Sequence, residues 1–287
     1  MVRSEVQAYY GSAGEREWTR LDKAEGVIEY AVTCHAMETY LPAGGRVLDI
    51  GGGPGRYSLW LAQRGYQVVL ADVTSELLRI AEAKLEAAGV RGQVEIVTGD
   101  ACDLSSWPAA CFDAVLSLGP FYHLTTPSDR AMAVAELVRV LRPGGVALIA
   151  VMPSYTFLRR TIADPDERHH LADPVFMHAL LDEGVFRNDQ PDRFTQGFGM
   201  IPSEISPYFE RYGLCTRNLL ACEGLASGLE EEIAALAVND PTLHEMVLNL
   251  VVRTANDPSL FGTSSHLLYI GQRVLAEDHL SLESENT

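Results

Sequence analysis

The residues best suited to chemistry in this sequence are carboxylates and glycines placed where short apolar runs end. Asp49 lies within such a run and is followed by Gly51, Gly53 and Gly55, which gives the spacing Asp-x-Gly-x-Gly-x-Gly. Glycine permits positive φ angles and, because it has no Cβ, allows a ligand to approach the backbone closely. An apolar run that breaks into a glycine loop and then resumes with helical spacing is typical of the opening of a nucleotide-binding βαβ unit.

This loop differs from the dinucleotide fingerprint Gly-x-Gly-x-x-Gly, because Arg56 stands where the third glycine would be. A glycine loop alone identifies no ligand, so the segments that follow must decide. The next apolar run ends at Asp72, at a distance that suits a carboxylate binding a pair of ribose hydroxyls. A third run, at residues 94–97, leads into Gly99 and Asp100, whose carboxylate can accept a hydrogen bond from an adenine amino group.

Together these strand ends resemble the cofactor half of a class I S-adenosylmethionine-dependent methyltransferase. The likeness is strong over residues 41–152 and returns more weakly at 202–224 and 264–275. The turn Leu-Arg-Pro-Gly-Gly at residues 141–145 is another feature common in that family. The resemblance implies an enzyme that uses S-adenosyl-L-methionine as its cofactor and needs no metal ion.

The resemblance also implies where the parts of the cofactor lie. Its methionine moiety is expected against Asp49 and Gly51, its ribose hydroxyls at Asp72, its adenine at residues 100–101, and its reacting methyl beside residues 118–119. The N-terminal arm is expected to contribute a tyrosine, with simple packing of that arm as the alternative. The complete set expected at the cofactor is Tyr10, Asp49, Gly51, Gly53, Asp72, Asp100, Ala101, Leu118 and Gly119.

His123 is the sharpest candidate for a catalytic base, since it follows the fourth apolar run by five residues and imidazole titrates near neutral pH. Its alternative role is hydrogen bonding or packing. Tyr122 is the second candidate, with similar placement and a less suitable pKa. Residues 118–121 read Leu-Gly-Pro-Phe where family members that methylate nucleobases or protein amides carry an Asn-Pro-Pro-Tyr-type tetrapeptide. This departure argues against such acceptors.

The other histidines suggest no metal site. His169, His170 and His178 have no carboxylate pattern around them, so we expect them on the surface of the molecule. His266 begins the last apolar run and is expected to be satisfied in the core.

Composition narrows the class of partner. The net charge is −17 and only 22 Lys and Arg are spread over 287 residues, which disfavours nucleic acid. Five cysteines without a Cys-x-x-Cys pair indicate free thiols in a reducing compartment. No apolar stretch approaches the roughly 18 residues of a membrane span, and no signal peptide is evident. We therefore expect a cytoplasmic protein that binds a small-molecule substrate rather than nucleic acid or membrane, with a homodimer left open.

The elements that must position these residues form a Rossmann-like α/β fold. Alternating apolar runs and helical segments predict a seven-stranded, mostly parallel sheet with helices on both faces. We expect one methyltransferase domain over residues 1–287, with a cofactor-binding core at 41–152. Residues 1–40 are expected to form an N-terminal helical lid, 153–201 a helical substrate cap inserted after the fifth strand, and 202–287 the C-terminal part of the core.

Within the cap, helices are predicted near residues 154–163 and 173–182, followed by a loop at 194–200. The last strand, at 266–274, is expected to run antiparallel beside the sixth, at 214–222. The aromatic side chains of the cap suit an apolar or aromatic substrate, although core packing explains most of them equally well. They are Phe157, Phe176, Phe186, Phe194 and Phe198.

The resulting hypothesis is methyl transfer to a small molecule, in secondary metabolism, with an O, N or C acceptor left open. One alternative is an enzyme of the same fold that uses the cofactor without methylating, for example by cyclising its methionine side chain. A second is an NAD-dependent oxidoreductase, which Arg56 and Asp100 disfavour. A third is a silent binding subunit.

Overall fold

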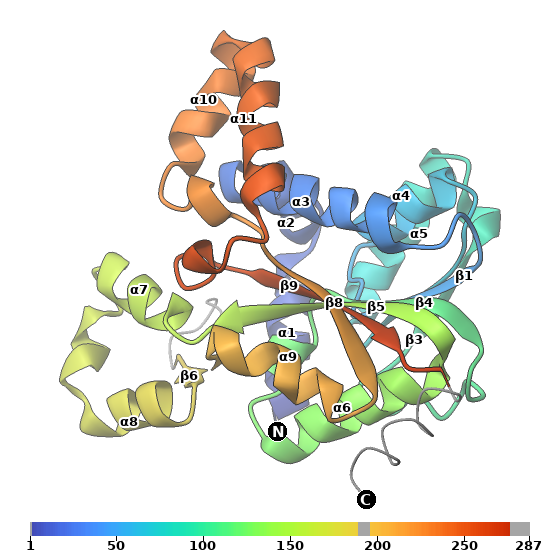
Figure 1. The fold of residues 1–287 in the computed structure, drawn as a ribbon, viewed down its shortest axis with the longest axis horizontal. Helices are drawn as coiled ribbons and strands as arrows, with labels where there is room; N and C mark the ends of the chain where they lie inside the picture. Colours follow the sequence, from blue (N-terminus) through green and yellow to red (C-terminus); the bar gives the residue numbers. More distant parts are fainter. Residues whose placement is uncertain (1, 189–195, 276–287) are drawn as a thin grey trace, which may run out of the picture.

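The computed structural model describes residues 2–188 and 196–275 (Figure 1). A central sheet carries parallel strands in the order β3-β2-β1-β4-β5. The inner strands are buried along nearly their whole length, which explains their unbroken apolar runs. These strands are β1 (Arg46–Ile50), β2 (Gln67–Asp72), β3 (Val94–Thr98), β4 (Phe112–Ser117) and β5 (Leu141–Pro153).

Helices cover both faces of the sheet, as predicted (Figure 1). On one face pack α3 (Ala24–Tyr40), α4 (Arg56–Gln63), α5 (Ser75–Ala87), α10 (Glu230–Asn239) and α11 (Pro241–Thr254). On the other face pack α6 (Pro127–Val140) and α9 (Pro202–Glu210). At the start of α6, the Thr126 side chain accepts the Asp129 N–H and Pro127 occupies the first turn.

The sheet ends in two antiparallel strands, β8 (Leu214–Ala221) and β9 (Leu267–Arg273). β9 runs antiparallel to both β5 and β8, which confirms the predicted direction of the last strand. Since Val151 of β5 pairs with Leu267 of β9, the start of β9 lies at the edge where the parallel strands end. Residues just before β9 are therefore brought close to the strand ends that carry the predicted site.

The insertion after β5 is a helical cap with a small strand pair. It contains α7 (Thr156–Ala163), the short helix η4 (Arg168–Ala172), α8 (Pro174–Asp182), β6 (Val185–Arg187) and β7 (Gln196–Met200). β7 pairs in parallel with the last two residues of β5, and β6 pairs with β7, so the sheet has nine strands rather than the predicted seven.

The predicted loop at 194–200 is thus wrong for residues 196–200. β5 continues past its pairing with β9, and its last two residues, Met152 and Pro153, pair with β7. Glycine is needed at 199, because a Cβ there would lie 2.9 Å from the Cα of Ser154. Close approach to β5 therefore decides the conformation of this glycine-containing segment.

The cap's phenylalanines pack into the protein interior. Phe157 and Phe186 stack with their centroids 4.8 Å apart, and Phe176 meets Phe186 edge-on at 5.9 Å. Phe198 lies edge-on to Phe121 at 6.5 Å, whereas Phe194 lies outside the described residues. Core packing, the alternative left open by the sequence, accounts for the four described rings.

The N-terminal residues form helices that lie across the carboxyl edge of the sheet. They are α1 (Val2–Ala13), α2 (Glu15–Trp18) and the short helix η1 (Thr19–Asp22). The amide of Gln7 donates a 2.8 Å hydrogen bond to the carbonyl of Val73, just beyond β2. No helix in the described part of the chain is long and apolar enough to cross a membrane.

Candidate active site

One cavity lies between the N-terminal helices and the ends of β1, β2, β3 and β4. It is lined by every residue that the sequence predicted for the cofactor or for catalysis. They are Tyr10, Asp49, Gly51, Gly53, Asp72, Asp100, Ala101, Leu118, Gly119, Tyr122 and His123.

The glycine loop after β1 has the backbone conformation that its sequence predicts. Gly51 and Gly53 have φ angles of +69° and +53°, which L side chains rarely adopt. A Cβ on Gly51 would lie 2.2 Å from the Cγ of Pro120, so the loop can approach the segment after β4 only without a side chain. The loop is further tied to β2, because the Gly53 N–H donates to Oδ2 of Asp72 at 2.9 Å.

Asp72 is a buried carboxylate at the end of β2, with its two oxygens held by backbone donors. Oδ1 accepts the Thr74 N–H at 2.8 Å, while Oδ2 accepts the bond from Gly53. Burial raises the pKa of Asp72 although these bonds oppose the shift. Each oxygen retains lone pairs, so the side chain can accept further hydrogen bonds from hydroxyl groups in the cavity.

Within the described part of the chain, Asp49 has a buried carboxylate oxygen that is not satisfied by a hydrogen bond. Its Oδ2 accepts the Ser58 hydroxyl at 2.7 Å, but its Oδ1 is buried and has no hydrogen-bond partner among the residues described. Burial raises the pKa of Asp49 to about 6, although Ser58 opposes the shift. A buried carboxylate of this kind is stabilised by a positive charge or a hydrogen-bond donor brought into the cavity. The methionine part of S-adenosyl-L-methionine, with its ammonium and sulfonium groups, fits that requirement.

His123 is buried and connects α1 to β7. Its Nδ1 lies 3.2 Å from the carbonyl oxygen of Gln196, and its Nε2 lies 2.8 Å from the hydroxyl of Tyr10. Because a carbonyl can only accept, Nδ1 carries the proton and Nε2 accepts the Tyr10 O–H. Burial lowers the pKa of His123 to about 4, so the ring is neutral at physiological pH.

Tyr122 lines the cavity beside His123. Its hydroxyl donates to the carbonyl of Leu118 at 3.4 Å, and burial raises its pKa. The phenol therefore stays protonated at neutral pH. Its ring also contacts a residue that was not predicted for the site, His266, with centroids 6.1 Å apart.

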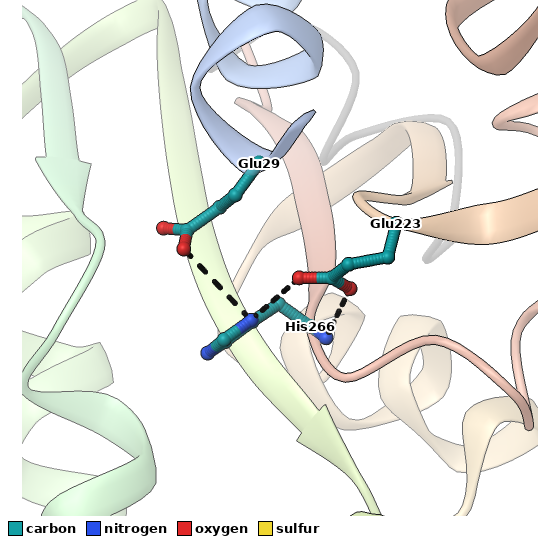
Figure 2. Close-up of side chains that lie close together, drawn as sticks. All are labelled: Glu29, Glu223 and His266. Atoms are coloured by element: carbon teal, nitrogen blue, oxygen red, sulfur yellow. Dashed lines mark hydrogen bonds and ion pairs between the residues drawn. The ribbon is translucent and has the colours of Figure 1, made fainter. Parts of the chain in front are cut away.

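A second polar group, which no sequence pattern indicated, borders the cavity. Arg20 lines the cavity and donates to both oxygens of Glu29, at 2.6 and 3.2 Å. Glu29 lies 4.0 Å from Nδ1 of His266, which contacts Glu223 at 2.9 Å (Figure 2). No local pattern could have predicted this group, because η1, α3, β9 and the end of β8 meet only in the folded chain.

The cap histidines differ from one another. His169 and His178 are exposed, as expected, and His178 contacts Asp182 at 2.6 Å. The surface prediction is wrong for His170, which is buried and stacks on Phe176 at 4.7 Å. His170 thereby joins the aromatic interior of this segment. Its stacking on an apolar ring, rather than its polarity, decides where it lies.

Comparison with known proteins places this geometry in a family. A profile described as a methyltransferase domain matches residues 47–145. The ubiquinone/menaquinone biosynthesis C-methyltransferase UbiE of Saccharophagus degradans is 30% identical over 194 residues, a match that covers 58% of this chain and 76% of that protein. The UbiE of Pseudomonas putida strain F1 is 31% identical over 194 residues, covering 58% and 74%.

Solved structures share the fold at lower identity. A S-adenosylmethionine-dependent methyltransferase of Methanosarcina mazei superposes with a TM-score of 0.59 at 21% identity, over 84% of this chain and 97% of that one. The 1,6-didemethyltoxoflavin-N1-methyltransferase of Burkholderia thailandensis gives a TM-score of 0.57 at 14% identity, over 95% and 88%. The chain is an enzyme that belongs to the class I methyltransferases, with S-adenosyl-L-methionine as its cofactor.

Proposed function

We propose that this methyltransferase transfers a methyl group to a small-molecule acceptor in secondary metabolism. The observation that carries the proposal is the roof over the cavity. Gln7 and Tyr10 of α1 hydrogen-bond to Val73 and His123 on the opposite side, so an acceptor must fit beneath a helix. A polymer such as nucleic acid, which the net charge of −17 also disfavours, does not suit a cavity closed in this way.

The similar proteins support a methyl acceptor that is a small molecule. The Burkholderia neighbour was solved with 1,6-didemethyltoxoflavin and S-adenosylhomocysteine, and the UbiE relatives are named for ubiquinone and menaquinone biosynthesis. The match to UbiE covers 58% of this chain, so a large part of the chain lies outside it. A different acceptor from that of the relatives is consistent with this divergence.

The residues with proposed roles lie along the cavity, from the end of β3 to the end of β4. Asp100 and the backbone of Ala101 bind the adenine, and the Asp72 carboxylate accepts hydrogen bonds from the ribose hydroxyls. The backbone at Gly51 and Gly53 allows close approach to the cofactor, and Asp49 meets its methionine part. Leu118 and Gly119 border the reacting methyl, and Tyr10 closes the site from above. Every one of these residues lines the same cavity, which supports the assignment.

When bound, the cofactor supplies a methyl group already activated by a positively charged sulfur. The chain's own contribution is orientation and exclusion of water. The Asp49 carboxylate favours the charged ligand, and the Gly51–Pro120 contact fixes the loop on which that ligand rests. Tyr122 stays protonated, so it can position an acceptor by donating a hydrogen bond but does not serve as a base at neutral pH.

Two measurements test this function. Calorimetry and thermal melting with S-adenosylhomocysteine and with NAD should show binding and a raised melting temperature for the first alone. A screen of small metabolites with S-adenosyl-L-methionine should then yield S-adenosylhomocysteine and a methylated product. Accumulation of methylthioadenosine would instead indicate cyclisation of the methionine side chain. Cofactor binding without any product across the screen would contradict the small-molecule proposal.

A further inference from the structure

His266 is held by a glutamate and has a second ring nitrogen directed elsewhere. Its Nδ1 lies 2.9 Å from Oε1 of Glu223, and because a carboxylate accepts, Nδ1 carries a proton. The other nitrogen, Nε2, points away from both Glu223 and Glu29 (Figure 2). In the neutral ring Nε2 therefore holds the lone pair, and the side chain remains 19% exposed.

Glu223 is held in place by hydrogen bonds other than the one to the His266 ring. Its Oε2 accepts the Ser264 hydroxyl at 2.7 Å and the backbone N–H groups of Ser265 and His266 at 2.9 and 2.8 Å. The side chain is 2% exposed. These donors hold the carboxylate in a single orientation, so Glu223 sets both the tautomer and the plane of the His266 ring.

A metal ion does not suit this cluster, although its three ligand atoms lie within 4.8 Å of one another. Arg20 already provides the positive charge, since its guanidinium binds both oxygens of Glu29. Nδ1 of His266, which would have to bind the ion, already carries the proton that it donates to Glu223. A divalent ion placed here would lie beside the guanidinium and would be repelled by its positive charge.

The cluster adjoins the cavity through two residues that line it, Arg20 and Tyr122. The proposed cofactor contacts run along β3, β2, β1 and β4, and the next strands in the sheet are β5 and β9. His266 directly precedes β9 at this same edge. Its ring faces Tyr122, which lines the cavity, and its neighbour Glu29 is bound to Arg20, which also lines it.

We propose that Nε2 of His266 accepts the proton of the methyl acceptor, with Glu223 as the positioning residue and the Arg20–Glu29 pair as the charge that supports it. This inference rests on the proposed function. The acceptor is then a small molecule with a protonated nucleophile, a hydroxyl or an N–H. Its lone pair forms the new bond to the methyl carbon, the carbon–sulfur bond breaks with its electron pair staying on sulfur, and the acceptor's proton moves to Nε2.

The charges around His266 support this role over that of His123. Burial opposes the charged ring, but the carboxylates of Glu223 and Glu29 raise the pKa of His266 above its ordinary value. Among the described residues, Tyr122 of η3 (Phe121–His123) and Arg20 of η1 also face the ring. His266 therefore takes up a proton more readily than His123, whose pKa burial lowers to about 4.

The first test is kinetic and uses an acceptor found in the metabolite screen. His266→Gln should lower kcat by 100-fold or more while S-adenosylhomocysteine affinity changes less than twofold. His35→Gln, an exposed histidine on the helix that carries Glu29, is the matched control and should keep the wild-type rate. Retention of more than half the rate by His266→Gln would overturn the proposal.

The second test measures the pH profile and does not depend on the folding of the His266 variant. In the wild type, kcat should fall as the pH drops through a pKa above 6.5, because the protonated ring accepts no proton. In Glu223→Gln, kcat should begin to fall at a lower pH, and its maximum value should be reduced. If kcat of Glu223→Gln falls at the same pH as in the wild type, His266 is rejected as the group that titrates.

A third measurement separates this inference from the proposed function. Histidine side-chain NMR of the protein alone should find His266 with its proton on Nδ1 and a pKa above that of His123. Addition of Mg²⁺ or Zn²⁺ alone should leave its signals unshifted. A His266 pKa below that of His123, or a specific metal-induced shift, would overturn the inference even if methylation of a small molecule is observed.

Discussion

The hydroxyl of Tyr10 lies 2.8 Å from Nε2 of His123, a contact between residues 113 positions apart that joins α1 to the segment after β4. It gives the N-terminal helix a specific hydrogen bond over the cavity. The pair also gives His123 the hydrogen-bonding role that its sequence position left open as the alternative to catalysis.

Removing this contact should loosen the lid more than it slows the chemistry. For Tyr10→Phe we expect S-adenosylhomocysteine affinity to fall about three- to tenfold, the effect of one net hydrogen bond of roughly 0.5–1.5 kcal/mol. Calorimetry and steady-state kinetics measure the two effects separately, with the exposed Tyr155→Phe as control. A collapse of kcat with unchanged affinity would favour the sequence-based hypothesis that His123 takes part in proton transfer.

Asp72→Ala should weaken cofactor binding by about tenfold or more, because charged hydrogen bonds worth roughly 1.5–3 kcal/mol are lost. Glu76→Gln, an exposed carboxylate in the first turn of the neighbouring α5, serves as the control and should bind normally. Titration of both variants with S-adenosylhomocysteine provides the comparison. Equal affinity in Asp72→Ala and the wild type would remove Asp72 from the site.

Asp49→Asn should stabilise the protein without cofactor at alkaline pH. Burial raises the folded-state pKa of Asp49 to about 6, so its stabilising contribution is present below the ordinary pKa of an aspartate and is lost as the pH rises through about 6. A shift of about two units corresponds to roughly 3 kcal/mol, an upper bound on the gain at pH 8. Urea unfolding should show a larger gain at pH 8 than at pH 4.5.

The same substitution should weaken binding of S-adenosyl-L-methionine, since the carboxylate no longer balances the positive charge of the ligand. Stability and affinity would then change in opposite directions. An Asp49→Asn protein that is neither more stable at pH 8 nor weaker in binding would show that the unpaired Oδ1 has no ligand.

Gly51→Ala should disrupt the loop after β1. Its φ of +69° and the 2.2 Å approach to Pro120 leave no room for a methyl group, so a loss of stability of about 1–3 kcal/mol is expected together with loss of cofactor binding. Gly92→Ala is the control, because a Cβ there meets nothing within 4 Å. Similar melting temperatures for the two variants would contradict the steric argument.

The parallel core could be predicted from the sequence, because the apolar runs of its strands agree with the way these strands pair in the sheet. Val68 to Ala71 are apolar because both faces of β2 are covered, and the carboxylate of Asp72 follows where that strand ends. Carboxyl ends of parallel strands meet at one edge of the sheet, so residues far apart in the chain could be placed in one cavity.

The remaining features depended on contacts that no local pattern encodes. Gln196 to Met200 contain two glycines and form a strand only because the end of β5 offers an edge. His266 was expected to be satisfied in the core, and its Nδ1 is indeed bonded to Glu223. The approach of Glu29 and Arg20 to that ring follows from the packing of the N-terminal helices, which the sequence pattern does not specify.

The 13-residue strand β5 has a consequence for how such an enzyme can change its specificity. Its inner residues pair with β4 and β9, whereas Met152 and Pro153 alone accept the returning strand of the cap. Within the sheet, the inserted segment is therefore joined to the cofactor scaffold through only these two residues of β5. Recombination can exchange that module between paralogues while the transfer machinery beneath it stays intact, provided the incoming module ends in a strand that fits the same short register.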